Sequence, residues 1–302
     1  AILYKELTKT YSTYRKTKNS KTQTKLSLNP DCVINEINAI TTVTDYPKLS
    51  PILEYRETHL ASMSGYAGMN LDDAYTLEKR SYDDSMTGVI GVSSDTAGNI
   101  GRERHLVIEP NVKNVRGIID VTDPEDKNKL DYTKYSTGIE SMIPGGLRHD
   151  DERRTAMAVK QKGHLLPIKD SSPLLITNGF DSMIHYRTSD DFSVVAKEDG
   201  KVLEIDTKSN IMVVEYKSGK RKAIDLSQKQ AKNGGGGMYL RNQLVTSFKT
   251  GDTFKRGAIL AYDKYFYKDT GPFGNRALIG TLVKSVSLGH SATHEDSTLF
   301  TQ

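Results

Sequence analysis

The 302-residue sequence has very little cysteine, no long apolar run and no large excess of charge of either sign. Because Cys32 is the one cysteine, an internal disulfide framework and a thiolate zinc site within the chain are both excluded, as fits a reducing cytosol. No run approaches the roughly 18 to 20 apolar residues of a membrane span, and no signal-peptide core opens the sequence. We therefore expect a soluble cytoplasmic protein with no membrane partner.

The formal charge of +4 arises from 42 basic and 38 acidic residues, so the chain lacks the bulk positive field of a histone-like protein. Any binding to phosphate must come from local clusters of basic side chains. The length suffices for two domains and a sizeable core, but only 36% of the residues are hydrophobic. This polar composition favours a core that is completed against partner chains.

Residues 1–34 form a basic arm. The first 30 residues hold one acid, Glu6, against the basic residues Lys5, Lys9, Arg15, Lys16, Lys18, Lys21 and Lys25. The interleaved tyrosines Tyr4, Tyr11 and Tyr14 would stack on bases if the arm held single-stranded nucleic acid. A mobile tail and a tether to another subunit are the alternatives that this composition favours.

Ionisable residues are densest in residues 147–167. Asp150 and Asp151 predict the first turn of a helix that begins near Glu152, because carboxylates accept hydrogen bonds from the unpaired amides there. One face of that helix would carry residues at spacings of three, three and four: Arg154, Met157, Lys160 and His164. Two cations, an imidazole and a thioether on one face suit a polyphosphate or a nucleic-acid strand. The alternative is a solvated charged helix.

Residues 49–101 combine a helix-like run, Leu-Ser-Pro-Ile-Leu-Glu at 49–54, with several glycines and the sequence Asn-Ile-Gly at 99–101. In the simplest interpretation these glycines serve turns, because glycine accepts positive φ and close packing. The residues that follow form a short basic cluster: Arg102, Glu103, Arg104 and His105. This cluster either touches a nucleic-acid backbone or guards an exposed strand edge.

The second half of the chain has the pattern of β-structure. Apolar or alternating stretches at 193–196, 201–205 and 211–216 are separated by turn residues, which predicts a small antiparallel β module. Gly251 and Gly257 frame a predicted strand-turn-strand corner. A biotinyl or lipoyl hairpin has a similar glycine pattern, but it needs a carrier-lysine motif, and the sequence contains none.

Two neighbouring carboxylates, Glu295 and Asp296, lie near the end of the sequence. Such a pair suits a hard cation that keeps part of its water shell. A helix N-cap is the alternative role for these residues.

Four stretches resemble landmarks of the beta subunit of multisubunit RNA polymerases and follow the family's order. They are the fork-like run at 49–101, His-Asp-Asp at 149–151 followed by Arg154, the Gly-Asp β element at 251–261 and Glu-Asp-Ser at 295–297. Each match is short, but the ordered set is specific. By this resemblance, roughly residues 35 to 302 form a divergent middle part of such a subunit, similar to the split beta subunits of giant bacteriophages.

The resemblance implies a role for each candidate residue. Arg154 would contact the phosphates of the incoming nucleotide. Glu295 and Asp296 would face Mg²⁺ mainly through water, while a beta-prime-like partner supplies the principal magnesium ligands. The path of the new RNA would be lined by Lys160, Lys162 and His164. In the fork region, nucleic acid would contact Arg80, Asn99, Arg102 and Arg104.

The implied fold is α+β and β-rich, with a fork-like helical and loop region followed by part of a double-psi β-barrel and a sandwich-barrel hybrid β module. The expected segments are the basic arm at 1–34, the fork-like region at 35–145, the barrel segment with the nucleotide-contacting helix at 146–180, the hybrid module at 181–262 and the return to the barrel at 263–302.

The implied function is that of a beta-subunit polypeptide in a DNA-dependent RNA polymerase, a nucleotidyltransferase that is not active as this chain alone. Its partners would be beta-prime-like subunits, the remaining beta-subunit polypeptides with the active-site lysines, template DNA, nascent RNA and ribonucleoside triphosphates. A phage-encoded chain would work in the host bacterial cytoplasm. The alternative is a non-catalytic structural or nucleic-acid-binding subunit, against which the charges retained at Arg154, Glu295 and Asp296 argue.

Overall fold

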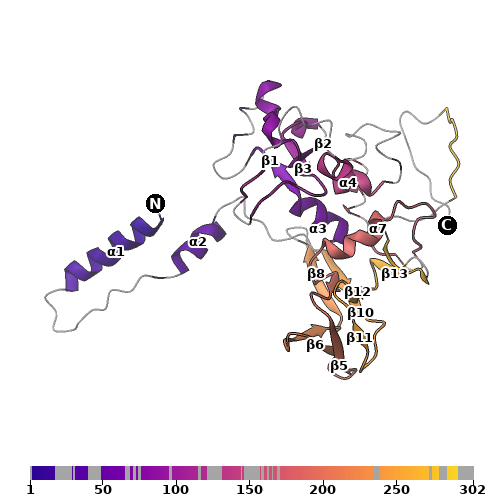
Figure 1. The fold of residues 1–302 in the computed structure, drawn as a ribbon. Coiled ribbons are helices and arrows are strands. Elements are labelled where there is room, and N and C mark those ends of the chain that lie inside the picture. Colours follow the sequence, from indigo (N-terminus) through magenta and orange to yellow (C-terminus); the bar gives the residue numbers. More distant parts are fainter. Residues whose placement is uncertain are drawn as a thin grey trace. The chain divides into compact units, whose positions relative to one another are not determined.

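The chain divides into two units in a computed structural model (Figure 1). Unit 1 comprises Ala1–His164 and Gln230–Arg241, and unit 2 comprises Leu165–Lys229 and Asn242–Gln302. The five segments predicted from the sequence divide the chain more finely and stay a prediction. The structure describes residues 2–17, 29, 31–39, 49–64, 69–70, 73, 76–94, 97–114, 117–120, 131–143, 145, 157, 160–161, 163–164, 166–168, 171–233, 238–271, 274–278 and 284–291.

The elements of unit 1 are short. With η marking a 3-10 helix, they are α1 (Ile2–Thr17), α2 (Asp31–Ala39), α3 (Pro51–Thr58), β1 (Leu60–Ser62), η2 (Glu78–Arg80), η3 (Asp84–Met86), β2 (Ile90–Ser94), η4 (Ala97–Asn99), β3 (Glu103–Leu106), η6 (Tyr132–Lys134) and α4 (Gly138–Ser141). The strands β8 (Lys229–Asn233) and β9 (Met238–Asn242) pair with each other, and most of their residues belong to this unit.

Helix α3 is the core helix of unit 1. Ser50 caps its start, because the Ser50 Oγ atom accepts a hydrogen bond from the Leu53 backbone N at 3.1 Å. Pro51 then occupies the first turn, where no backbone donor is required. Ile52 and Tyr55 are only 3% and 1% exposed, so α3 is enclosed rather than lying on the surface.

The sheet of unit 1 has the order β1-β3-β2, with both pairs antiparallel. Strand β3 is therefore the middle strand, and His105 within it is 1% exposed. The interpretation of the basic cluster that begins at Arg102 as the guard of an exposed strand edge is wrong, because β3 has a partner on each side.

Unit 2 contains most of the strands. Its elements are α7 (Phe180–Met183), η7 (Ile184–Tyr186), β4 (Ser193–Val195), β5 (Gly200–Asp206), β6 (Ile211–Tyr216), β7 (Arg221–Asp225), β10 (Leu244–Val245), β11 (Thr253–Phe254), β12 (Ile259–Asp263), β13 (Tyr267–Asp269) and β14 (Asn275–Ala277). The antiparallel module predicted between residues 193 and 216 is confirmed. Gly251 and Gly257 have φ values of 93° and 86°, which confirms the corner predicted around β11 and β12.

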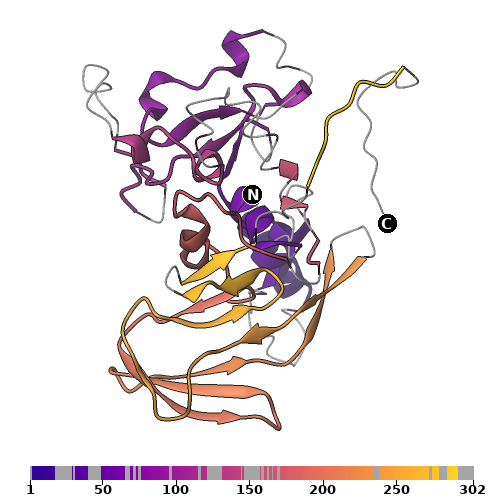
Figure 2. The same ribbon diagram turned by 90° about the vertical axis from the view of Figure 1, so that its right-hand side faces the viewer.

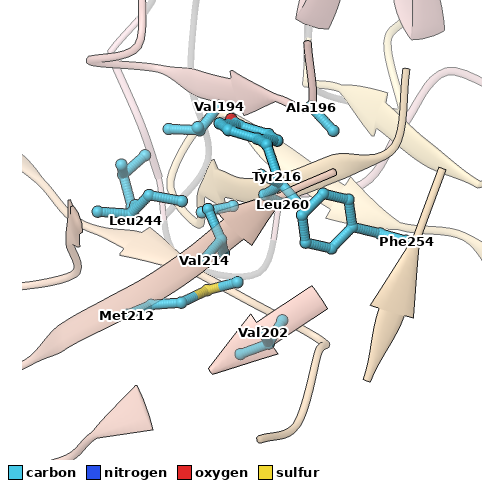
Figure 3. Close-up of a cluster of buried hydrophobic side chains, with 11 residues drawn as sticks. Val194, Ala196, Val202, Met212, Val214, Tyr216, Leu244, Phe254 and Leu260 are labelled. Atoms are coloured by element: carbon cyan, nitrogen blue, oxygen red, sulfur yellow. The ribbon is translucent and has the colours of Figure 1, made fainter. Parts of the chain in front are cut away.

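The core of unit 2 lies between two sheets, one ordered β11-β5-β6-β7 and the other β10-β12-β4. Figure 3 shows side chains from both sheets directed toward one another, among them Val202 and Val214 from the first sheet and Leu260 from the second. Gly200 permits the close pairing of β5 with β6 inside the first sheet, because a Cβ atom there would lie 2.4 Å from the Glu215 backbone O. No larger residue fits at this position without a shift of backbone.

Asp263 and His185 are two of the titratable side chains that are buried in unit 2. Asp263 is 0% exposed and accepts hydrogen bonds from the backbone N of Tyr265 at 2.7 Å and of Gln243 at 3.3 Å. His185 is 1% exposed; its Nδ1 atom lies 2.8 Å from the Ser193 Oγ atom, and its ring stacks on Tyr267. Both groups hold neighbouring strands and turns in place.

The fold is thus mixed helix and sheet and rich in strands, as the sequence predicts. The strands of unit 2, in pink to yellow in Figure 2, form small open sheets. Within the described ranges no sheet closes into a barrel. The double-psi barrel stays a prediction.

Candidate nucleic-acid interface

The turn that joins β2 to β3 brings together the residues predicted to contact nucleic acid in the fork region: Arg80, Asn99, Arg102 and Arg104. The Arg102 Nη2 atom donates a hydrogen bond to the Asn99 Oδ1 atom at 2.5 Å. Arg102 is only 9% exposed. These two side chains therefore brace the turn, and Arg102 offers little surface to a strand of nucleic acid.

Arg80 approaches the same turn from the end of η2. Its Nη1 atom donates to the Ile100 backbone O at 3.4 Å. The approach depends on Gly101, which has a φ of 77° and where an added Cβ atom would lie 2.9 Å from the Arg80 backbone O. Gly101 thus combines a backbone conformation that favours glycine with a contact that excludes larger side chains.

Arg104 lies within the sheet itself, on β3, opposite Ser94 of β2 and Ala61 of β1. Its Nη1 atom donates to the Val92 backbone O at 2.8 Å, and the residue is half-buried. The guanidinium is therefore held across β2 while part of the side chain stays accessible.

Tyr82 is a residue of this region that the sequence did not single out. Its hydroxyl lies 3.1 Å from the backbone O of both Ala61 and Arg102, so it links β1 to the turn. Burial raises the pKa of the Tyr82 hydroxyl; the positive charge of Arg104 lowers it and the negative charge of Glu103 raises it further. One tyrosine in a polar run gives no sequence signal of this link, because both acceptors belong to the backbone.

The segment predicted to follow the nucleotide contact is anchored on α3. Ser50 donates from Oγ to the Gly163 backbone O at 2.6 Å, and a Cβ atom at Gly163 would meet Leu53 at 3.4 Å. Lys160 has a helical conformation and is half-buried, whereas His164 is exposed and its Nδ1 atom lies 2.8 Å from the Lys160 backbone O. The structure thus places Lys160 and His164 on one helical turn beside α3.

Four predicted site residues lie outside the described residues: Arg154, Lys162, Glu295 and Asp296. Their roles stay predictions. Within the part of the chain that the structure describes, no three side chains of His, Cys, Asp or Glu gather where they could hold a metal ion.

The basic arm contains a helix, α1, and contacts join it to α2. Tyr4, Leu7 and Tyr11 follow at spacings of three and four, so they share one face, and they are 76%, 50% and 59% exposed. Lys5 and Lys9 are offset from this row and project from another face. Arg15 follows Tyr11 by four residues and therefore lies on the tyrosine face, so the helix has a basic side chain beside its tyrosines. Its role as a nucleic-acid arm, a mobile tail or a subunit tether stays a prediction.

The model of the bacteriophage RNA polymerase family matches residues 1–72 of the 302. The matched part contains α1, α2, α3 and β1. It relates the chain to phage RNA polymerases. No curated protein matches the chain. None of the helices in the described ranges has the length and apolar character needed to cross a membrane.

Proposed function

We propose that the chain is a beta-subunit polypeptide of a multisubunit DNA-dependent RNA polymerase, of the kind that giant bacteriophages split over several chains. The observation that carries the proposal is the match of residues 1–72 to the phage RNA polymerase family. It supports a polymerase-related role independently of the three landmarks around Arg154, Gly251 and Glu295, which lie beyond it in the sequence. Their order along the chain favours the multisubunit type.

The proposal includes a finer fold. Residues 181–262 would be the sandwich-barrel hybrid module, which the two open sheets of unit 2 packed on a shared core support. The segments 146–180 and 263–302 would contribute strands and the nucleotide-contacting helix to a double-psi barrel that is completed by partner chains. The partners are beta-prime-like subunits and the remaining beta-subunit polypeptides.

In the proposed reaction, the 3′ hydroxyl of the RNA attacks the α-phosphate of a ribonucleoside triphosphate and pyrophosphate leaves. Arg154 neutralises the nucleotide phosphates and holds them in position. The path of the transcript is lined by Lys160, Lys162 and His164. The chain supplies charge and position and no catalytic base, so it needs its partners for activity.

Magnesium is the expected cofactor. The donor types of Glu295 and Asp296 fit it, because a hard cation that keeps part of its water shell prefers carboxylate oxygen. Bound Mg²⁺ would neutralise charge that develops on the phosphate oxygens. The two carboxylates would orient water around the ion, while its principal ligands come from the beta-prime-like partner.

Replacement of Arg154 tests the proposal, and its neighbour Arg153 provides a matched control. The enzyme would be reconstituted with its partner polypeptides and assayed for magnesium-dependent ribonucleotide incorporation on a primed scaffold. We expect Arg154→Ala to weaken transition-state binding by about 2–4 kcal/mol, mainly through a higher nucleotide KM, because a charge-assisted phosphate contact is lost. Arg153→Ala should have a much smaller effect.

An unchanged nucleotide KM in the Arg154→Ala variant would contradict the proposed contact between Arg154 and the nucleotide phosphates. The alternative function, a non-catalytic structural or nucleic-acid-binding subunit, predicts that neither arginine variant changes incorporation while assembly and scaffold binding persist. A chain that joins no polymerase polypeptide would contradict the proposed function as a whole.

A further inference from the structure

His164 ends a helical turn that is fixed to helix α3. Its backbone N donates to the Gln161 backbone O at 3.1 Å, and its Nδ1 atom lies 2.8 Å from the Lys160 backbone O. The preceding residue, Gly163, is buried, and its backbone O accepts the hydrogen bond from the Ser50 Oγ atom. The backbone that carries the His164 ring is therefore tied to the core helix of unit 1, although His164 itself is exposed.

The contact with Lys160 decides which nitrogen of the His164 ring carries hydrogen. A backbone carbonyl oxygen only accepts hydrogen bonds, so the Nδ1 atom must be the donor in this contact. In the neutral ring the second nitrogen, Nε2, then has no hydrogen and is an acceptor. Nε2 is the ring nitrogen farther from the backbone, and none of the described residues forms a hydrogen bond with it. His164 therefore offers a ligand an acceptor rather than a donor.

An acceptor at this position restricts the part of an RNA strand that His164 can bind. Phosphate oxygens are acceptors themselves, so they cannot pair with the Nε2 atom of the neutral ring. The ribose 2′-hydroxyl can donate a hydrogen bond. Bases can also donate, but their identity changes along a transcript, whereas every ribonucleotide has a 2′-hydroxyl. A contact that serves transcripts of any sequence therefore falls on the sugar.

We propose that His164 recognises the transcript as RNA, with its Nε2 atom accepting a hydrogen bond from a ribose 2′-hydroxyl. The proposal rests on the proposed function, which places the transcript along Lys160 and His164. Lys160 contacts the phosphate backbone, because an ammonium group donates hydrogen bonds and carries positive charge. One helical turn thus contacts two different groups of the strand, and a DNA strand would satisfy only the lysine.

Two substitutions separate this role from that of a brace for the turn. In His164→Gln the side-chain amide reaches the place of Nε2, so an acceptor stays there and the bond to the Lys160 backbone O is lost. In His164→Asn the shorter side chain places its amide near the place of Nδ1, so the bond to Lys160 is kept and no group replaces Nε2. Circular dichroism should show that both variants fold as the wild type does, because His164 is exposed.

The assay measures how tightly the polymerase, reconstituted with its partner polypeptides, retains an RNA primer on a scaffold. In a set of primers, one ribose at a time is replaced by 2′-deoxyribose or by 2′-fluororibose, in which fluorine keeps the sugar conformation of RNA but cannot donate a hydrogen bond. The measurement is made at about pH 8, where an imidazole ring is neutral.

We expect the wild type to retain the primer about fivefold less well when one particular ribose is replaced by either analogue, a loss that matches one hydrogen bond. His164→Gln should keep this preference for the hydroxyl. His164→Asn should lose the preference at that ribose, because its amide does not reach the sugar.

A preference for the hydroxyl that persists in His164→Asn would overturn the proposal. Weaker retention of every primer by the same factor in both variants would also overturn it, because His164 would then only brace the turn. If the wild-type enzyme incorporates ribonucleotides but retains all primers equally, the sugar contact fails and the proposed function stands. If the chain joins no polymerase polypeptide, the proposed function and the sugar contact fail together.

Discussion

Replacement of the buried Asp263 by asparagine is expected to reveal how unit 2 responds to pH. Asp263 is fully buried between β12 and the turn that follows it. Burial raises the pKa of its carboxyl from 3.8 to about 7, although the backbone N–H groups of Tyr265, Gln243 and Phe266 and the charge of Lys264 oppose this change. The folded state therefore prefers the protonated carboxyl.

The direction in which stability changes with pH follows from the pKa of the Asp263 carboxyl in the unfolded chain and in the folded chain. Below pH 3.8 the carboxyl is protonated in both states, and its stabilising contribution is complete. Between pH 3.8 and about 7 the unfolded chain releases its proton and the folded chain keeps it, so stability falls as pH rises. One pKa unit corresponds to about 1.4 kcal/mol, which gives a loss on the order of 4 kcal/mol across this interval.

His185 acts in the opposite direction. Burial lowers its pKa from 6.5 to about 4, although a hydrogen bond with the backbone of Asn275 opposes this change. Its contribution is complete above pH 6.5 and is lost as pH falls toward 4. The loss is on the order of 3 kcal/mol. The contributions of the two groups to the unfolding free energy therefore nearly cancel between pH 4 and 6.5. Together they leave the stability of wild-type unit 2 almost independent of pH in that range.

The Asp263→Asn variant lacks the titration of Asp263 and keeps the titration of His185. We expect the variant to gain about 2 kcal/mol of unfolding free energy between pH 4.5 and 6.5, which is the contribution of His185 alone, whereas the wild type changes by less than about 1 kcal/mol. The constant offset between the two proteins reflects the new amide beside Gln243 and does not depend on pH. Exposed carboxylates such as Asp206 and Asp225 are common to both proteins and cancel in the comparison.

Hydrogen exchange of β4 and β12 peptides, corrected for the intrinsic rate at each pH, measures this free energy within unit 2 alone. His185→Gln is the complementary variant, and it should lose stability as pH rises from 4.5 to 7. Parallel profiles of the wild type and Asp263→Asn would refute the reasoning, because Asp263 would then be ionised in the folded chain at pH values well below 7.

Two further substitutions test the packing. Gly101→Ala should destabilise unit 1 by about 1–3 kcal/mol in thermal unfolding, because residue 101 has a φ of 77° and an added Cβ atom would lie 2.9 Å from the Arg80 backbone O. Gly98→Ala is the control and should change stability little, because an added Cβ atom there has no neighbour within 4 Å. Equal effects of the two substitutions would contradict the role assigned to Gly101. Leu260→Ala should lower the unfolding free energy of unit 2 by about 2–5 kcal/mol, because the Leu260 side chain is 0% exposed. Leu175 is 85% exposed, so Leu175→Ala should be nearly neutral. A comparable loss of stability in both variants would refute the assigned core.

The sequence predicted the strands of unit 2 well because their cues are local. β5 and β6 alternate or run apolar and are separated by turn residues, and Gly251 and Gly257 mark a corner that needs positive φ. Periodicity and turn chemistry operate over a few residues, so a single sequence contains them. The order of the strands within the sheets depends on pairing between distant segments, and the sequence did not predict it.

The fork region shows where local cues fail. Arg102 was predicted to contact nucleic acid, but the structure buries most of its side chain and bonds it to Asn99. Its exposure depends on the place of β3 in the middle of the sheet, which no pattern within 102–105 indicates. Tyr82 was missed for the same reason, since its acceptors are carbonyl groups about 20 residues away in sequence on either side.

Arg104 combines a structural and a surface position. Its hydrogen bond to the Val92 backbone uses one of the five N–H donors of the guanidinium and fixes the direction of the side chain across β2. An arginine held in this way loses less side-chain entropy when it binds a phosphate than a freely rotating surface arginine does. The structural role of Arg104 is therefore compatible with a contact to nucleic acid, which stays a prediction for this residue.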